Sequence, residues 1–179
     1  MEIMSYVVQG GLTHQDSMGS KETLYTGSVQ YMSAGTGVRH SEFNISGKDS
    51  LRILQLWINP NQKGLKPNYG SRLYQPEDRL NKLLHVVSGD DKAFPETIAI
   101  NQDANIFVSQ IEPTQTVSYE VKAGRQVYLV CIEGDLGISG QVSLTERDAV
   151  EISGPSELVF SNEKPQGKLA HFLMIEMAA

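Results

Sequence analysis

Two side chains in the stretch YMSAGTGVRHSEFN, residues 31–44, have the types and spacing of metal ligands. His40 and Glu42 are two residues apart, and on a β-strand residues i and i+2 point to the same face. An imidazole and a carboxylate side by side suit iron, manganese, nickel or another divalent ion. A second interpretation stays open on spacing alone, in which His40 hydrogen-bonds Glu42 or a backbone group near the end of the strand.

The other histidines and the cysteine are weaker candidates. His14 and Asp16, in THQDS, also lie at i and i+2. His85 and His171 lie in the apolar runs LLHVV and AHFLMI, which favours structural roles. Cys131, in VYLVCI, is the only cysteine, which excludes an internal disulfide and a cysteine-based metal cluster. We expect it to be a buried, inert thiol.

The elements that must position these residues are short strands. Runs such as IMSYVVQG, LRILQLWI and QVYLVCIEG are rich in Val, Ile, Leu, Tyr and Phe, and turn residues separate them. This pattern predicts an all-β fold. QPEDRLNKL is the best helix candidate, with Pro76 suited to the first helical position. Trp57 is expected to pack in the core or between two β-rich units of the chain or, alternatively, to line a pocket for a flat aromatic substrate.

A segment rich in Pro, Gly and polar residues predicts a linker at 59–78. It would separate an N-terminal unit, 1–58, from a C-terminal unit, 79–179. The first unit has residues for four or five strands, whereas a closed small barrel needs about eight. We therefore expect the N-terminal unit to lack strands that would precede its first residue. We also expect the sheet edges exposed in this way to favour a homodimer.

Composition excludes several classes of partner. The net charge is −6 over 179 residues, which argues against a direct nucleic-acid partner because phosphate contacts need a basic face. No apolar stretch approaches the roughly 20 residues that span a bilayer. The first residues have neither a basic region nor a cleavage site typical of a signal peptide. These features predict a cytoplasmic protein without a membrane partner.

The sequence resembles the pirin family of bicupins over nearly its whole length. AGTGVRHSEFN, with HQDSMG before it and LQLWINP after it, carries the resemblance. Gly27, Ser33 and Gly35, followed by His40 and Asn44, are similar to the second cupin motif. They depart from it by a serine in place of proline and a longer spacer, as pirins do. The resemblance implies two consecutive cupin (jelly-roll) β-barrels, with the N-terminal one truncated here.

The resemblance also implies a metal, usually iron, in the N-terminal cupin. Its ligands would be two histidines of an H-P-H segment, a third histidine that corresponds to His40, and a glutamate that corresponds to Glu42. The family does not use the histidine and aspartate at the positions of His14 and Asp16 as ligands. Glu2 matches a glutamate just after the H-P-H segment, which this sequence lacks. We therefore expect Fe(II) or another divalent metal to bind weakly or not at all.

Three explanations of the short front end remain open: a start codon placed too late, a shortened chain, or loss of the first motif. For the full-length form, the resemblance implies quercetin 2,3-dioxygenase activity on a small aromatic, flavonol-like substrate. Glu42 would then be both a metal ligand and the base for the flavonol hydroxyl. The alternative is a non-catalytic, regulatory pirin that binds other proteins.

Overall fold

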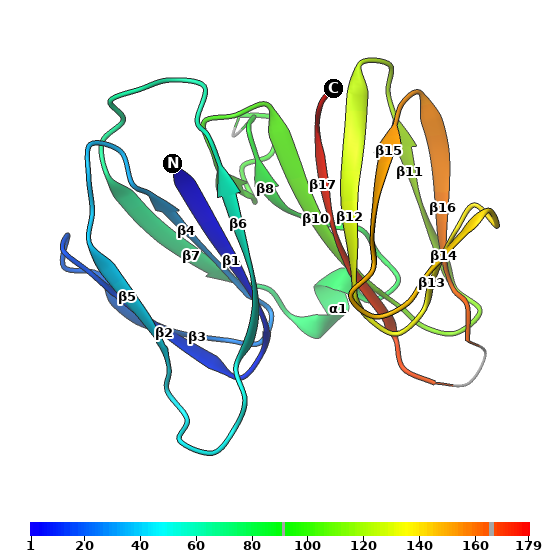
Figure 1. The fold of residues 1–179 in the computed structure, drawn as a ribbon, viewed down its shortest axis with the longest axis horizontal. Coiled ribbons are helices and arrows are strands. Elements are labelled where there is room, and N and C mark those ends of the chain that lie inside the picture. The colour runs from blue at the N-terminus through cyan, green and yellow to red at the C-terminus, as the bar shows by residue number, and fades with distance from the viewer. Residues whose placement is uncertain (91, 165–166) are drawn as a thin grey trace. The chain divides into compact units, whose positions relative to one another are not determined.

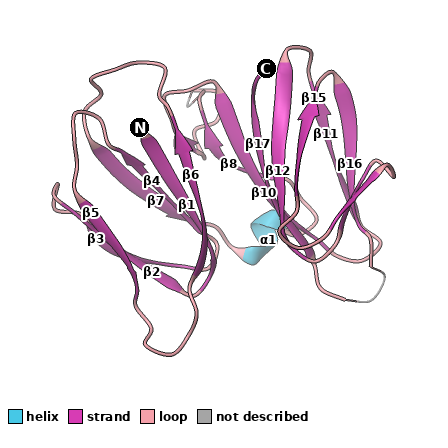
Figure 2. Ribbon diagram, viewed as in Figure 1, coloured by secondary structure: helices cyan, strands magenta, loops and turns pink. Residues whose placement is uncertain are grey.

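Strands form nearly all of the regular structure in the computed structural model, which describes residues 1–90, 92–164 and 167–179 (Figure 2). The predicted all-β class is therefore confirmed. The predicted short helix is present as α1 (Pro76–Arg79), with Glu77 and Asp78 in its first turn. There the acidic side chains face the positive end of the helix dipole. No helix in the described part of the chain has the length and apolar character that crossing a bilayer requires.

The chain forms two compact units, described here one at a time. The first contains Met1–Gln75 and Asp91–Gln102, and the second contains Pro76–Asp90 and Asp103–Ala179. The segment 59–78, predicted as a linker, contains strand β7 (Asn68–Leu73). This strand pairs with β4 (Ser28–Ser33), so it belongs to a sheet of the first unit.

Two sheets build the first unit (Figure 1). The larger sheet has the order β6-β1-β4-β7, with β6 at Arg52–Ile58 and β1 at Glu2–Gln9. The smaller sheet has the order β3-β2-β5, with β3 at Lys21–Tyr25, β2 at Gly11–Asp16 and β5 at His40–Asn44. The two-residue strand β9 (Ile98–Ala99) lies in the same unit.

A polar row crosses the middle of the larger sheet. Ser5 of β1 stands opposite Gln30 of β4 and Gln55 of β6, and Gln30 in turn stands opposite Ser71 of β7. At one end of the unit, a small apolar cluster of Val7, Leu12 and Leu24, with Leu51 and Ile53 against it, supplies the packing. Val7 and Ile53 of this cluster stand opposite one another, two residues along from Ser5 and Gln55, so the polar row and the apolar cluster share one face of the larger sheet.

The second unit also has two sheets, around a larger apolar core. One contains β15 (Ala149–Ser153), β12 (Arg125–Glu133), β17 (Ala170–Ala178), β10 (Ala104–Ile111) and β8 (Leu84–Ser88), in that order. The other contains β11 (Thr116–Val121), β16 (Ser156–Asn162), β13 (Leu136–Ile138) and β14 (Val142–Leu144). Phe160 and Phe172 pack against one another in its core with their rings tilted by 42° and their centroids 4.8 Å apart.

Candidate functional site

Strand pairing in the smaller sheet of the first unit gathers acidic and imidazole side chains on one face. His14 of β2 stands opposite Glu42 of β5 and opposite Glu22 of β3. Two residues further along β2, Asp16 stands opposite His40 of β5. Because directly opposite residues of neighbouring strands point to the same face, this register brings together both predicted residues and both members of the second His-x-Asp pair.

His14 lies at the centre of this group and is completely buried. Its ring stacks on Tyr69, with centroids 4.3 Å apart, and on His40 at 5.7 Å. Its Nε2 atom lies 3.1 Å from Asp16 Oδ2. Its Nδ1 atom has no hydrogen-bond partner among the described residues. His40 itself is exposed, so the stack runs from the interior of the unit to its surface.

The Asp16 carboxylate is held by several donors. Its Oδ1 atom accepts hydrogen bonds from the backbone N–H groups of Met18, at 2.9 Å, and Ser20, at 3.0 Å. Burial on its own would raise the pKa of Asp16, but the hydrogen bonds from His14, Ser20 and Met18 outweigh it and keep that pKa below its ordinary value. Asp16 therefore fixes the turn after β2 and orients His14.

The Glu42 carboxylate joins the two sheets of the unit. Gln30 Nε2 donates to its Oε1 atom, and Gln55 Nε2 donates to its Oε2 atom at 2.8 Å. Both amide nitrogens also lie 3.3 Å from Ser5 Oγ. Both oxygens of the predicted metal ligand are thus occupied by donors from the polar row of the larger sheet.

Glu22, on the other side of His14, has a comparable arrangement. Its carboxylate accepts hydrogen bonds from Tyr69 O–H, at 3.0 Å, and from Ser71 Oγ, at 2.8 and 2.9 Å. Burial, with the Glu22 charge adding to it, raises the pKa of Tyr69. Tyr69 is therefore a neutral donor at physiological pH.

The donors present do not by themselves fit a catalytic metal centre. Such centres commonly have three protein ligands and open positions. In the described part of the chain no group of three or more His, Cys, Asp and Glu side chains could hold a metal ion. His40 and Glu42 are donors of suitable chemistry, but they are two, and the Glu42 oxygens already accept amide hydrogen bonds.

Sequence reasoning missed the partners of Glu42. Gln30 and Gln55 come from strands distant in sequence, and only the pairing of β1 with β4 and β6 brings them together. A signal was available, because Ser5, Gln30 and Gln55 are each a polar residue inside an apolar strand. Trp57, expected in the core or between the two units, or alternatively at a pocket, is 63% exposed. It lies on the edge strand β6, and its Nε1 atom donates to Gln55 Oε1 at 3.0 Å.

The histidines of the second unit make packing contacts. His85 stacks on Phe107, with centroids 4.4 Å apart, and its Nε2 atom lies 3.1 Å from Asn105 Oδ1. Burial lowers the pKa of His85. His171 is buried, and its Nδ1 atom lies 3.7 Å from the Glu133 carboxylate.

Two family matches cover most of the chain. Residues 1–58 match the family described as Pirin, and residues 85–177 match the family described as Quercetinase C-terminal cupin domain. Over 140 residues the chain is 36% identical to a protein named quercetin 2,3-dioxygenase from Escherichia coli K12, covering 78% of this chain and 58% of that protein. Over 153 residues it is 37% identical to a pirin-like protein from Caulobacter vibrioides, covering 85% and 64%. The chain thus spans less than two thirds of either relative.

Solved structures give the same picture of the fold. The crystal structure of YhhW from Escherichia coli superposes with a TM-score of 0.87 at 29% identity, covering 98% of this chain and 71% of that chain. A structure of the same bacterial pirin in complex with nickel(II) gives a TM-score of 0.86 at 29% identity, covering 99% and 72%. Together with the two family matches, these similarities confirm the expected pair of cupin domains.

Proposed function

Because the chain belongs to the pirin family of two-cupin proteins, we propose that its first unit contributes His40 and Glu42 to a divalent-metal centre for flavonol dioxygenation. The observation that carries this proposal is the register of β2 and β5, which presents both side chains on one face beside a polar interior. The relative named quercetin 2,3-dioxygenase and the nickel-bound pirin support the reaction and the class of metal. Fe(II) is the metal that we propose for this reaction.

In this proposal, Glu42 has a second role as the base that takes the proton of a flavonol hydroxyl. A carboxylate that already accepts amide hydrogen bonds from Gln30 and Gln55 can accept one from a hydroxyl if an amide moves aside. Gln55 is exposed and is the donor that can move. Trp57, which is exposed beside it, offers a flat apolar face to an aromatic ring.

Metal binding tests the ligand assignment directly. We expect the chain to bind Ni(II) or Fe(II) weakly in anaerobic equilibrium dialysis, since two donors are fewer than catalytic centres use. His40→Ala and Glu42→Gln should each lower the metal bound by about tenfold. Glu151→Gln, an exposed position on β15, is the matched control and should change nothing. Unchanged metal binding in both His40→Ala and Glu42→Gln would refute the assignment.

Quercetin depletion and oxygen consumption, measured with saturating Fe(II), test the reaction. We expect turnover to depend on added metal and to fall in Glu42→Gln more than in His40→Ala, because Glu42 has two roles. If metal binds and no oxygen is consumed, the dioxygenase proposal is wrong for this chain.

A second candidate is a non-catalytic pirin that binds other proteins. The hydrogen bonds from Gln30 and Gln55 to both oxygens of Glu42 favour it, because the carboxylate holds the two sheets together without a metal. Pull-down with and without a chelator separates the candidates. A partner retained equally under both conditions, and by His40→Ala, supports the binding protein, and a partner lost with chelator contradicts it.

A further inference from the structure

The outer face of the smaller sheet in the first unit carries exposed apolar side chains. Tyr25 of β3, Phe43 of β5 and Ile45, which directly follows β5, are 58%, 48% and 52% exposed. Because strand residues alternate between faces, they point away from the interior that His14 and Glu42 face. Antiparallel sheets usually place polar residues on the face that meets water, so packing of the core does not explain three apolar residues there.

These three side chains form one continuous surface, which we call the outer patch. Tyr25 stands opposite Gly11 of β2, and on the other side of Gly11 the Ile45 N–H donates to its carbonyl oxygen at 3.2 Å. A Cβ atom at Gly11 would lie only 2.8 Å from Ile45 Cγ2 and 3.3 Å from Tyr25 Cε1. Tyr25 and Ile45 therefore meet over a residue without a side chain, and Phe43 extends the patch along β5.

Two basic residues lie at the other end of the same face. Lys21 begins β3, which ends at Tyr25, and both residues lie on one face of that strand. Arg39 precedes β5 and continues its register, because its backbone carbonyl oxygen accepts from Ser17 N at 2.9 Å. Both Lys21 and Arg39 are exposed, and neither has an ion-pair partner among the described residues. The outer face is thus apolar at one end and positively charged at the other.

The carboxylates of these three strands do not compensate this charge. Asp16, Glu22 and Glu42 all lie on the inner face, where other side chains of the unit hold them. Asp49, in the loop after β5, accepts a hydrogen bond from Ser46 at 3.0 Å. A chain with a net charge of −6 therefore has a sheet face on which positive charge borders apolar surface.

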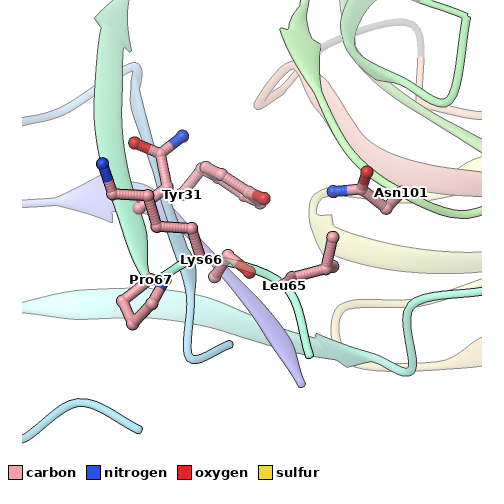
Figure 3. A pocket seen from close by; sticks show the side chains of 7 residues that line it. Tyr31, Leu65, Lys66, Pro67 and Asn101 are labelled. Atoms are coloured by element: carbon pink, nitrogen blue, oxygen red, sulfur yellow. The ribbon is translucent and has the colours of Figure 1, made fainter. Parts of the chain in front are cut away.

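The hollow beside β4 is less suited to a ligand. It has a volume of about 400 Å³, and its lining includes Tyr31 and Asn101, whose side chains point toward one another (Figure 3). Both donate to the buried Glu2 carboxylate, Tyr31 O–H at 2.6 Å and Asn101 Nδ2 at 2.7 Å. These polar groups are already satisfied, whereas Lys21 and Arg39 are not.

We propose that the outer face of the smaller sheet binds a segment of a partner protein that carries acidic and apolar side chains together. The apolar side chains of that segment cover the outer patch, and its carboxylates pair with Lys21 and Arg39. Exposed apolar surface bordered by charged residues is typical of protein interaction sites, and complementary charge steers the partner to it. The inference rests on the second candidate function, a pirin that binds other proteins, and supplies its surface and the chemistry of its partner.

Two other occupants fit this face less well. A second copy docked through the same face brings Lys21 and Arg39 of both copies onto a surface whose strands present no carboxylate to them. A nucleic acid needs a wider basic surface than two residues on a chain with a net charge of −6.

Selection from a random peptide library displayed on phage, with the immobilised chain as target, tests the chemistry of the partner. We expect the enriched peptides to combine Asp or Glu with Leu, Ile or aromatic residues. The most enriched peptide, once synthesised, should shift the backbone amide signals of Thr13, Phe43 and Ile45 in the ¹⁵N-labelled chain. Its counterpart with Asn and Gln in place of the acids should bind at least about fivefold more weakly.

Variants at exposed positions test the face itself. Phe43→Thr keeps a residue suited to a strand and should weaken peptide binding about tenfold. Lys21→Glu and Arg39→Glu should each weaken it about fivefold. The matched controls are Leu73→Thr, at a 56% exposed position of β7, and Lys63→Glu, at an exposed lysine of another loop, and both should bind the peptide like the parent chain.

His40→Ala, and the parent chain with a chelator, should bind the peptide unchanged, which separates this face from the proposed metal centre. The proposal is overturned if no acidic peptides are enriched, or if Phe43→Thr binds the peptide as tightly as the parent chain. It is also overturned if single-stranded DNA displaces the peptide, or if the Phe43 signal moves when the chain alone is concentrated, because a nucleic acid or a second copy is then the occupant. A pull-down partner retained by both Phe43→Thr and Lys21→Glu leaves the second candidate function standing and rules out this surface.

Discussion

Glu2 is a single residue on which the local structure of the first unit depends. It is completely buried and accepts three hydrogen bonds from Tyr31 and Asn101. In Glu2→Gln, one oxygen becomes an NH₂ group that faces donors, so at least one buried hydrogen bond is lost. We expect the free energy of unfolding of the first unit to fall by about 1–3 kcal/mol, measured by urea denaturation. Glu151→Gln is the exposed control, and equal midpoints for the two variants would contradict the argument.

For single residues, sequence reasoning could place two side chains on the same face of a strand but could not identify the residues to which they hydrogen-bond. The i, i+2 rule put His40 and Glu42 together, and the register of β2 and β5 does so. The rule cannot say that Glu42 meets Gln30 and Gln55, because that contact depends on how two sheets face each other. The use of His40 and Glu42 as metal ligands stays a prediction.

Gly35 shows how a turn and a loop depend on one another. Its φ is +49°, and a Cβ atom there would collide with the carbonyl oxygen of Leu65 and lie 2.7 Å from Pro67 N. Gly35→Ala must therefore displace backbone, and we expect a loss of about 1–3 kcal/mol of stability. Gly47→Ala is the matched control, because nothing lies within 4 Å of its Cβ position. Thermal unfolding of both variants checks this, and equal losses would contradict it.

In the second unit, Glu176 of β17 links neighbouring strands and makes stability depend on pH. Its carboxylate accepts hydrogen bonds from Arg125 of β12 and, at 2.8 Å, from Asn105 of β10. Burial alone would raise the pKa of Glu176, but these hydrogen bonds hold that pKa below its ordinary value of 4.5. The folded state therefore binds this proton less readily than the unfolded state.

The sign of the pH effect follows from this shift. The stability that Glu176 contributes is fully present above pH 4.5 and is lost as the pH falls through the lower pKa of the folded state. Urea midpoints measured from pH 7 down to pH 3 should fall more steeply for the parent chain than for Glu176→Gln. Parallel pH profiles would rule out this role for the carboxylate.

Among the elements, the strands with apolar patterns were predictable and β7 was not. IMSYVVQG and LRILQLWI predicted β1 and β6, and Pro76 predicted the start of α1. The sequence of β7, NYGSRL, shows no apolar alternation because Tyr69 and Ser71 donate hydrogen bonds to Glu22. A strand that faces a polar interior lacks the hydrophobic signal on which strand prediction depends.

At the scale of the whole molecule, each unit has its own buried cluster. Phe172→Ala removes a completely buried ring from the second unit and should lower its free energy of unfolding by about 3–5 kcal/mol. The measurement is the reaction of Cys131 with a thiol reagent at increasing urea. Cys131 is buried, and burial raises its pKa to about 11, so it should react only after the second unit unfolds.

The control for this variant is Val159→Ala, at a position of β16 that precedes Phe160 and is 41% exposed, with an expected change within about 0.5 kcal/mol. NMR signals of Leu12 and Leu24, in the core of the first unit, should persist at urea concentrations where Cys131 of Phe172→Ala has become reactive. Their simultaneous loss would show that the two cores do not unfold separately.

The overall organisation was predictable in outline because two β-rich segments flank a stretch rich in Pro and Gly. The boundaries were not, because the first unit takes in residues from both sides of α1. Sequence distance alone cannot reveal that Asn101 hydrogen-bonds Glu2, 99 positions away. The homodimer through sheet edges stays a prediction.

Trp57 gives this chain a built-in optical reporter. It is the only tryptophan, and a relay of hydrogen bonds runs from its indole N–H to Gln55 and from Gln55 to Glu42. A cation or hydroxyl compound that binds the Glu42 carboxylate and displaces the Gln55 amide would also change the surroundings of the indole that bonds Gln55. Binding of a metal ion or a hydroxyl compound in the first unit should therefore be detectable as a change in intrinsic tryptophan fluorescence, without an added label.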